Sequence, residues 1–297
     1  MTDVERITAS CLCRAVAWSV HGPLFNMSHC HCGMCRKAHA APFATYVGAK
    51  ASGFRFDRGE SEIVRYRSSS SHERCFCGRC GSVVPAAPLG KSAYFPAGCM
   101  DDGPVGQAPP IVPSLHIFVG SKASWYTIAD GLPQHAECPA SWQQGAVTAQ
   151  RATDVAPDVA PRADNSATGS CLCGRVAYAI AAGAPLGVHY CHCNRCRKAR
   201  AAAHNANVFI ERDRFEWLRG ESELGSFKVP DAVRYSQVFC RHCGSGMPIA
   251  RAERAVVPAG SVDTPFTPAD LRHIFVASKA PWFEIQDSIT QWPEYPG

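Results

Sequence analysis

Cysteine is the residue type whose number and spacing could do chemistry in this chain. The sequence has 17 cysteines, and fourteen of them fall in short clusters of the forms C-x-C, C-x-C-x-x-C and C-x-x-C. The odd total and the strain of bridging the two cysteines of a C-x-C both argue against disulfides. Clustered thiolates are typical ligands of zinc, whereas the familiar ferredoxin spacings of iron–sulfur proteins are missing. We interpret the clusters as metal ligands, with zinc favoured over an iron–sulfur cluster.

The clusters belong to a pattern that occurs twice. Five segments of the first half return in the same order in the second half, at an offset of 157 to 163 residues. The matched segments are 11–18 with 171–178, 30–37 with 191–198, 58–62 with 219–223, 76–82 with 239–245, and 116–125 with 273–282. A repeat of this length is a duplicated domain. We expect domains at 1–137 and 167–297, joined by an extended, mobile linker at 138–166 that is rich in Ala, Pro, Asp and Gln.

Each repeat supplies seven cysteines, in the order two, three, two. Zinc takes four thiolates in closed structural sites and three protein ligands in open ones, so seven divides as four plus three. Spacing alone leaves open whether a different set of four closes first. The closed sets would be Cys11, Cys13, Cys77 and Cys80, and Cys171, Cys173, Cys240 and Cys243. The open triplets would be Cys30, Cys32 and Cys35, and Cys191, Cys193 and Cys196.

An open zinc with three thiolates suits thiol chemistry better than water activation. Its formal charge of about −1 weakens it as a Lewis acid, and no Glu stands within or beside either triplet as the zinc deaminases require. Binding an incoming thiol as a thiolate is the more natural task. Arg36 and Lys37, and likewise Arg197 and Lys198, follow the last cysteine and could offset the charge or attract an anionic thiol. For the two lysines, solvated charges on a short helix are an equal alternative.

The elements that must position these residues are mostly short strands. Aromatic or alternating runs at 16–20, 43–47, 54–56 and 117–119 are typical of strands. Helix-favouring residues follow each triplet, at 36–41 and 197–203. The sequence therefore predicts a mainly β fold: two tandem zinc-binding β domains with little helix.

Composition restricts the possible partners and compartment. The net charge of +5 is spread along the chain, without the basic cluster expected of a nucleic-acid-binding protein. No segment has the apolar length of a membrane span, and the first residues lack a secretory pattern. We expect a cytoplasmic protein without nucleic-acid or membrane partners, and a reducing compartment again favours metal over disulfides. Nothing in the sequence predicts an oligomeric state.

At this point the motifs resemble a known family. The order C-x-C, C-H-C-x-x-C-R-K, F-C-x-x-C-G and H-I-F-V-x-S-K-A-x-W, present in both repeats, resembles the glutathione-dependent formaldehyde-activating enzymes, also called the GFA or centromere-protein-V domain family. The resemblance implies an Mss4-like zinc-binding β fold with the four-plus-three division, and about four zinc ions per chain, two in each domain. It also implies a carbon–sulfur lyase that combines glutathione with formaldehyde to S-hydroxymethylglutathione, with the glutathione sulfur at the open triplet. The family's zinc ligands fall on all fourteen clustered cysteines.

The two repeats differ beside their triplets. Repeat one has Phe43 and Arg74, as the family does, where repeat two has His204 and Gln237. If one site alone is active, we expect it to be the first. His204 is interpreted as a partly exposed histidine, in preference to a polar group of an altered pocket.

Several other residues are given structural roles. Cys75, Cys99 and Cys138 lie outside the repeated pattern and are expected to be buried and inert. Trp125 and Trp282 are expected in the core. His116 and His273 could face the site or make a structural hydrogen bond, and Asp101 and Asp263 could orient a ligand or cap a turn.

Three hypotheses for function remain open at this stage. The favoured one is a zinc-dependent carbon–sulfur lyase acting on a small thiol adduct, with glutathione as the thiol. The second is a zinc-dependent hydrolase or other catalyst acting on an unidentified small molecule. The third is a non-catalytic, zinc-stabilised binding module whose open position is filled by an internal ligand.

Overall fold

The computed structural model describes residues 6–70, 72–103, 109–139, 159–230, 232–233 and 235–296. Across these residues the chain forms twenty β-strands and two short α-helices. The expected mainly β fold with little helix is confirmed. The predicted linker lies mostly at 140–158, outside the described residues. No helix in the described part of the chain is both long enough and apolar enough to cross a membrane.

Repeat one has three small sheets and one helix, α1 (Gly33–His39). In spatial order the sheets are β1-β2-β5, β10-β3-β4-β9 and β6-β7-β8. The strands are β1 (Ile7–Ser10), β2 (Ala17–Val20), β3 (Leu24–Cys30), β4 (Ala44–Lys50), β5 (Phe54–Arg58), β6 (Ile63–Arg67), β7 (Glu73–Cys77), β8 (Val83–Val84), β9 (Ser92–Pro96) and β10 (Leu115–Ile117).

Repeat two has the same plan, with one helix, α2 (Asn194–Arg200), and the sheets β11-β12-β15, β18-β19-β14-β13-β20 and β16-β17. Its strands are β11 (Ala167–Ser170), β12 (Ala177–Ile180), β13 (Val188–Cys191), β14 (Asn205–Glu211), β15 (Phe215–Arg219), β16 (Leu224–Lys228), β17 (Ser236–Cys240), β18 (Ile249–Ala250), β19 (Arg254–Pro258) and β20 (Leu271–Ile274). In both repeats the last strand lies parallel to the strand that leads into the triplet.

Both helices start and end about three residues earlier than the sequence predicted. The triplet itself opens each helix, because the Cys32 sulfur caps α1 by accepting a hydrogen bond from the Cys35 amide, and Cys193 does the same for α2. Each helix then ends at an alanine with left-handed backbone angles, Ala40 or Ala201. Helix propensity alone could not locate these ends, since a cysteine is not a typical cap.

The predicted strand at 117–119 was also placed too late. The strand is β10, which ends at Ile117, because Phe118 takes a φ of +57° and starts a short 3₁₀ turn. Phe275 repeats this conformation at the end of β20, with a φ of +58°. Positive φ is costly for an aromatic residue and has no reliable sequence signal.

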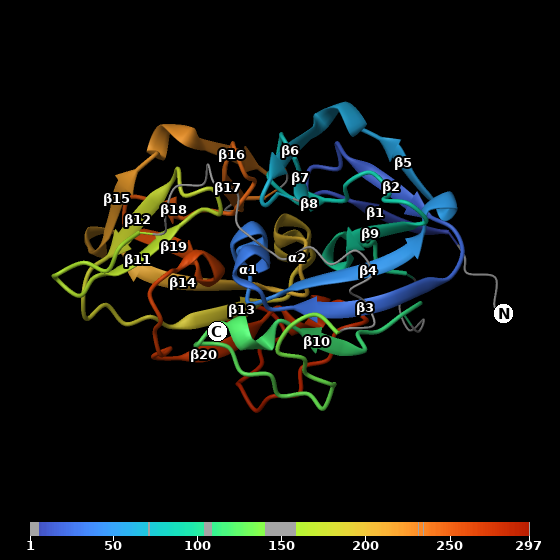
Figure 1. Ribbon diagram of the computed structural model, residues 1–297. Coiled ribbons are helices and arrows are strands. Elements are labelled where there is room, and N and C mark those ends of the chain that lie inside the picture. The colour runs from blue at the N-terminus through green and yellow to red at the C-terminus, as the bar shows by residue number, and fades with distance from the viewer. Residues whose placement is uncertain are drawn as a thin grey trace.

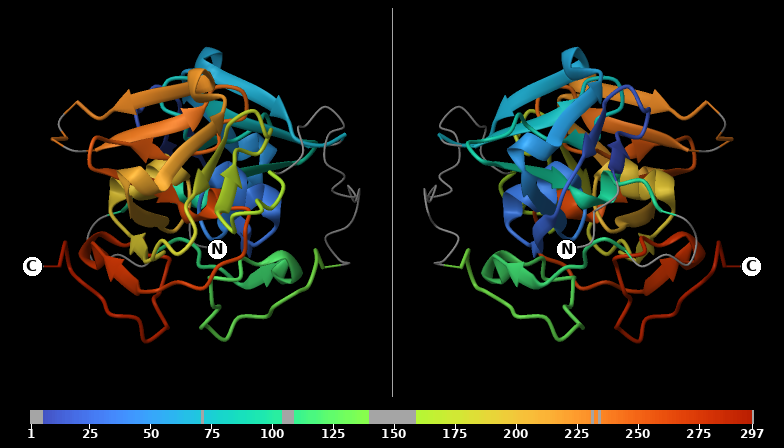
Figure 2. Two further views of the ribbon diagram at one scale, coloured as in Figure 1. Left: turned by 90° about the vertical axis from the view of Figure 1, so that its left-hand side faces the viewer. Right: turned by 90° about the vertical axis from the view of Figure 1, so that its right-hand side faces the viewer.

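The two repeats exchange their final segments. We call residues 119–139 the arm of repeat one and residues 276–296 the arm of repeat two. Trp125 of the first arm packs in the core of repeat two and stacks on Phe266, with ring centroids 6.0 Å apart. Trp282 and Phe283 of the second arm pack in the core of repeat one. Figure 2 shows both arms on the same side of the molecule. The tryptophans are core residues as expected, but each belongs to the core of the other repeat.

The helices also lie across the boundary between the repeats. Figure 1 shows α1 and α2 at the centre of the molecule, between the sheets of the two repeats. Helix α1 contacts the 3₁₀ turn η8 (Ala259–Ser261) of repeat two, and α2 contacts η3 (Ala97–Cys99) of repeat one. Glycine is required at both contacts, because a Cβ on Gly98 or Gly260 would lie 2.2 Å or 2.4 Å from the backbone of the opposite helix end. The repeats therefore form one interlocked unit.

Candidate metal centres

The two flanking cysteine pairs of repeat one meet at one buried point. Cys11 and Cys13 lie in the turn after β1. Cys77 ends β7 and Cys80 lies in the turn that follows, and the four sulfurs are within 4.8 Å of one another. The Val16 amide donates to the Cys11 sulfur at 3.3 Å, which favours a thiolate there. Repeat two gathers its equivalent cysteines in the same way. That cluster consists of Cys171, Cys173, Cys240 and Cys243.

The spacing of the sulfurs tests whether a metal ion fits. A tetrahedral ion with metal–sulfur bonds of about 2.3 Å separates its ligands by about 3.8 Å. The Cys11–Cys13 and Cys13–Cys77 sulfur pairs are 3.5 and 3.6 Å apart, and the Cys171–Cys173 and Cys173–Cys240 pairs are 3.4 and 3.7 Å apart. These distances fit four ligands around one ion, and they exclude disulfides, whose sulfurs are about 2 Å apart.

Each three-cysteine cluster is built where a strand runs into a helix. Cys30 ends β3, Cys32 caps α1 and Cys35 lies in its first turn, so a C-x-C-x-x-C spacing turns three sulfurs toward one point. The parallel partner β10 fixes the strand end, because the His31 amide donates to the Ile117 carbonyl at 3.0 Å. Cys191, Cys193 and Cys196 repeat this arrangement. In both triplets the middle cysteine is the partly exposed one, so an ion there would be approached from that side.

Mutual contact of the thiols favours ionisation of one cysteine in each triplet, whereas the pKa of each of the other two is raised. Contact with Cys30 and Cys32, followed by the charge of Arg74, holds the pKa of Cys35 well below its usual range. In repeat two, contact with Cys191 and Cys196 lowers the pKa of Cys193 to about 3. A metal ion would bind the cysteines as thiolates, and the three sulfurs of each triplet, which lie within 4.8 Å of one another, are placed to hold one ion.

A histidine pair lies behind each triplet. His31 Nε2 is 2.8 Å from His116 Nδ1, and His116 Nε2 is 3.0 Å from the carboxylate of Asp130. Because Asp130 accepts, His116 donates to it through Nε2 and accepts from His31 through Nδ1. His192, His273 and Asp287 form the same chain, with distances of 2.8 and 3.2 Å. Of the two roles proposed for His116 and His273, the structural hydrogen bond is the one observed.

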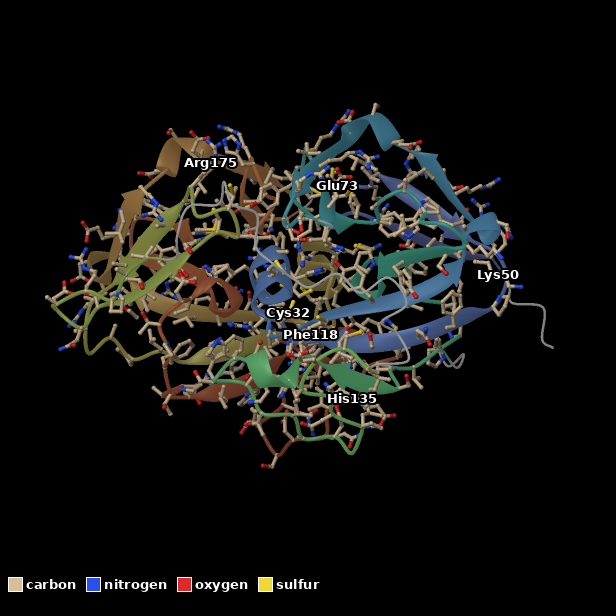
Figure 3. The ribbon with its side chains drawn as sticks, in the orientation of Figure 1. Cys32, Lys50, Glu73, Phe118, His135 and Arg175 are labelled. Carbon is tan, nitrogen blue, oxygen red and sulfur yellow. The ribbon has the colours of Figure 1, made fainter. Side chains whose placement is uncertain are left out.

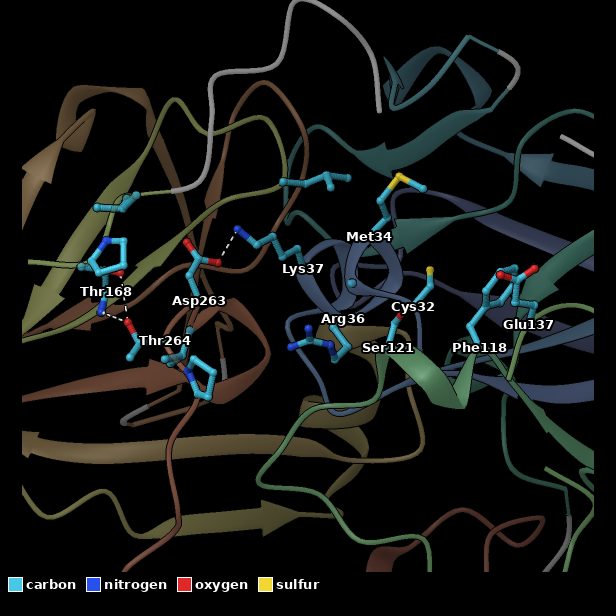
Figure 4. Close-up of a pocket in the computed structure, with 16 residues that line it drawn as sticks. Cys32, Met34, Arg36, Lys37, Phe118, Ser121, Glu137, Thr168, Asp263 and Thr264 are labelled. Atoms are coloured by element: carbon cyan, nitrogen blue, oxygen red, sulfur yellow. Dashed lines mark hydrogen bonds and ion pairs between the residues drawn. The ribbon is translucent and has the colours of Figure 1, made fainter. Parts of the chain in front are cut away.

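The first triplet opens onto a cavity between the repeats. The cavity has a volume of about 650 Å³, within the usual range for small-molecule sites. Cys32 and Arg36 line one wall, and Asp263 and Thr264 of repeat two line the opposite wall. Figure 3 places Cys32 beside Phe118 near the centre of the molecule, and Figure 4 shows Arg36 projecting between the two walls. A small anionic molecule could reach the sulfurs through this space.

The matching arginine of repeat two is held differently. Arg197 is fully buried and forms an ion pair with Asp102 of repeat one. The residue that corresponds to Asp102 on the other side is Thr264, which carries no charge and lines the cavity. Arg36 is partly exposed. Arg36 therefore lies at a cavity, whereas Arg197 is enclosed inside the protein.

The two lysines after the triplets are not solvated charges. Lys37 pairs with Asp263 at 2.5 Å and Lys198 pairs with Asp101 at 2.7 Å, so each ion pair crosses from one repeat to the other. Lys198 is 7% exposed. The alternative of solvated charges is thus wrong, and the two aspartates serve the repeat boundary. The partners are distant in sequence, and no local pattern could have revealed them.

His204 also differs from its prediction. It is 1% exposed, so the interpretation as a partly exposed histidine is wrong. It lies at the boundary between the repeats, where its ring is 5.1 Å from Tyr190 and 5.6 Å from Phe43. Burial lowers its pKa to about 3. Cys75 and Cys99 are buried as expected, whereas Cys138 is partly exposed.

Sequence reasoning missed three aspartates that hold residues near the triplets. Asp130 and Asp287 orient the histidine pairs, and Asp102 neutralises Arg197. The first two occur at equivalent positions of the repeats, which is the signal that could have found them. Asp102 has no counterpart, and it becomes visible only when the repeats are packed together.

Comparison with known proteins agrees with the geometry. The family model described as "Glutathione-dependent formaldehyde-activating enzyme" matches residues 6–121 and again 166–278, which together make up most of the chain. The protein is thus a tandem member of a cysteine-rich family. The chain belongs to the glutathione-dependent formaldehyde-activating enzyme family, and its two copies confirm the resemblance found in the sequence.

Individual relatives are more distant. The chain is 34% identical over 88 residues to an uncharacterized lyase of Schizosaccharomyces pombe, an alignment that covers 29% of this chain and 61% of the relative. It also resembles a crystal structure of a Rhodobacter sphaeroides protein at 20% identity and a TM-score of 0.28, covering 33% of this chain and 90% of that one. A TM-score this low does not indicate a shared fold or function.

Proposed function

We propose that this protein is a zinc-dependent carbon–sulfur lyase that works at the first triplet, Cys30, Cys32 and Cys35. The observation that carries the proposal is that the partly exposed Cys32 lines a cavity of about 650 Å³ together with Arg36. Family membership and the lyase description of the yeast relative support the same class of reaction. Zinc is the metal that suits clusters of three and four thiolates.

The reaction joins a thiol to an aldehyde. The sulfur of glutathione forms a bond to the carbon of formaldehyde, the C=O bond becomes C–OH, and the thiol proton ends on that oxygen. The product is S-hydroxymethylglutathione, and no oxidant or reductant is needed. When bound, zinc would supply a Lewis acid that keeps a thiol in its thiolate form near neutral pH.

The residues of the chain would bind and orient the thiol. The cavity beside Cys32 has room for a small peptide, and Arg36 places a guanidinium where a carboxylate of glutathione could pair with it. Such a pair contributes about 1.5–3 kcal/mol of binding. Phe118, also in the cavity wall, gives the site an apolar face.

The second triplet would hold zinc without turning over. Arg197 is fully buried and paired with Asp102, so a substrate carboxylate could not reach it. We therefore assign catalysis to repeat one and a structural role to the second triplet. The zinc content would be about four ions per chain, with the other two ions in the four-cysteine clusters.

The exchange of glutathione with ¹³C-formaldehyde, followed by NMR, tests this function. The protein should raise the exchange rate above that of the uncatalysed reaction at equal reactant concentrations. Cys32→Ser should lose at least 100-fold of that acceleration, whereas the matched variant Cys193→Ser should keep at least about half. Absence of any acceleration by the zinc-loaded wild type, or full activity in Cys32→Ser, would refute the proposal.

A further inference from the structure

A buried arginine lies beside each triplet, but the two arginines come from different elements. In repeat one it is Arg74 on β7, 7% exposed, and in repeat two it is Arg200 at the end of α2, 4% exposed. The position matching Arg74 is Gln237, and the position matching Arg200 is His39. Both repeats thus place a positive charge next to their triplet, repeat one from a strand and repeat two from a helix.

In repeat one the arginine contacts the cluster directly. Arg74 Nη2 donates to the Cys35 sulfur, with the two atoms 3.6 Å apart. His39, which occupies the helix position, is engaged elsewhere. Its Nδ1 donates to the Arg200 carbonyl at 2.8 Å, and its Nε2 accepts from the Tyr46 hydroxyl at 2.9 Å. His39 is therefore a neutral ring in this network, and Arg74 is the residue that brings a charge.

In repeat two the arginine is buried with part of its guanidinium group unsatisfied. Nε and Nη1 of Arg200 have no hydrogen-bond partner among the described residues. Space for this side chain comes from Gly246, because a Cβ there would lie 1.5 Å from Arg200 Nη1. Repeat one has Val83 at that position. Three positions have thus changed together, His39, Arg74 and Val83 becoming Arg200, Gln237 and Gly246.

Charge explains why an arginine is present in both repeats. A divalent ion with three thiolates carries about −1, and an uncompensated buried charge costs several kcal/mol. One guanidinium, with its positive charge, brings the total charge of the ion and its three thiolates to about zero. Cys196 and Arg200 are one turn apart in α2 and so lie on the same face of the helix. Burial lowers the pKa of Arg200, and the negative charge of a Cys196 thiolate acts in the opposite direction. A buried arginine with unsatisfied N–H groups has a physical reason if the neighbouring sulfurs carry negative charge around an ion.

We propose that Arg74 and Arg200 are the charge partners of the two three-cysteine metal sites. They are positioning residues: they hold the metal-bearing sulfurs in their anionic form and do not contact substrate. The repeats differ at the three positions named above, so the arginine comes from a strand in repeat one and from a helix in repeat two, but it compensates the charge of the triplet in both. The proposal requires a metal ion at each triplet but does not depend on which reaction the first triplet carries out.

Metal affinity of the full chain, measured by chelator competition with zinc and with cobalt, tests the proposal. Arg74→Gln copies the residue of repeat two without its arginine, and it should weaken one metal ion per chain by about 10–100-fold, as is usual when a partner of a ligand is removed. The thiolate-to-cobalt charge-transfer band should also move to lower energy, because the Cys35 sulfur loses a hydrogen bond. Retention of the other three ions would report an intact fold.

The triple variant His39→Arg, Arg74→Gln, Val83→Gly rebuilds the arrangement of repeat two in repeat one. It should restore affinity to within about threefold of wild type. Arg74→Lys, which keeps the charge, should retain most of the affinity and serves if Arg74→Gln does not fold. Arg55→Gln, at an exposed ion pair with Asp57, is the control and should change neither affinity nor band. Wild-type affinity and spectrum in Arg74→Gln, or no recovery in the triple variant, would overturn the proposal. The metal affinity and the cobalt spectrum are both measured without glutathione or formaldehyde. They would therefore test this proposal even if the protein did not catalyse the lyase reaction.

Discussion

The two triplets have the same ligands and different surroundings. Around the first, Arg36 is partly exposed in a cavity whose far wall includes Thr264. Around the second, Arg197 is buried and paired with Asp102. The cysteines are retained in both copies, so the ability to hold a metal is shared. The middle cysteine is partly exposed in both triplets, and the difference lies in the neighbouring arginine, which lines a cavity in repeat one and is buried in repeat two.

The closed clusters should show the largest effect. Cys77→Ser removes one ligand of a four-cysteine site, and structural zinc contributes about 10–16 kcal/mol, comparable with the whole stability of a domain. Because Trp282 and Phe283 of repeat two pack in the same core, we expect the unfolding of both repeats in one transition. Metal content and thermal unfolding monitored by circular dichroism would measure this.

Cys32→Ser provides the comparison within repeat one. It should keep the fold and lower the melting temperature far less than Cys77→Ser does, because the open triplet supports less of the core. Cys240→Ser should behave like Cys77→Ser if the repeats are interlocked as described. A Cys77→Ser protein that melts like the wild type would show that its cluster holds no structural ion.

The next effect concerns the difference between Thr264 and Asp102. Thr264→Asp places a carboxylate opposite Arg36, as Asp102 stands opposite Arg197. Loss of one charge-assisted contact to substrate, about 1.5–3 kcal/mol, should lower kcat/KM by about 10–100-fold without changing metal content. Steady-state kinetics at varied glutathione concentration would measure it.

Lys50→Gln is the matched control for that substitution. It makes the same change in net charge, and Figure 3 places Lys50 at the far edge of repeat one. Its kcat/KM should stay within about twofold of wild type, since surface charges at this distance are screened by salt. Equal losses in the two variants would mean that Arg36 does not recognise substrate locally.

The smallest predicted effect is a pH dependence specific to His204. Its pKa in the folded protein is about 3, below the ordinary 6.5, because it is buried. The unfolded chain therefore binds a proton below pH 6.5 that the folded protein does not, and His204 lowers stability as the pH falls, by up to about 1.4 kcal/mol per pH unit. His204→Phe, which copies Phe43, should remove that slope between pH 6.5 and 5. Urea unfolding at several pH values would measure it, and an unchanged slope would contradict the assigned burial.

The number of cysteines and the internal sequence repeat predicted much of the structure. Each repeat has clusters of two, three and two cysteines, and this count predicted the groups of four and three in which the sulfurs lie. The repeated motifs predicted the family. Helix ends were missed because a cysteine acts as the cap. The exchanged arms, the Lys37–Asp263 pair and the burial of His204 were missed for one physical reason. Each depends on packing between the repeats, which leaves no periodic pattern in either of them.

Titration of the cobalt-substituted protein with glutathione tests the open first triplet most directly. The account predicts that the d–d spectrum of one cobalt ion per chain changes, that the change persists in Cys193→Ser, and that it is lost in Cys32→Ser. A response from two ions per chain, or a response that survives in Cys32→Ser, would contradict the proposal that the first triplet alone binds the thiol.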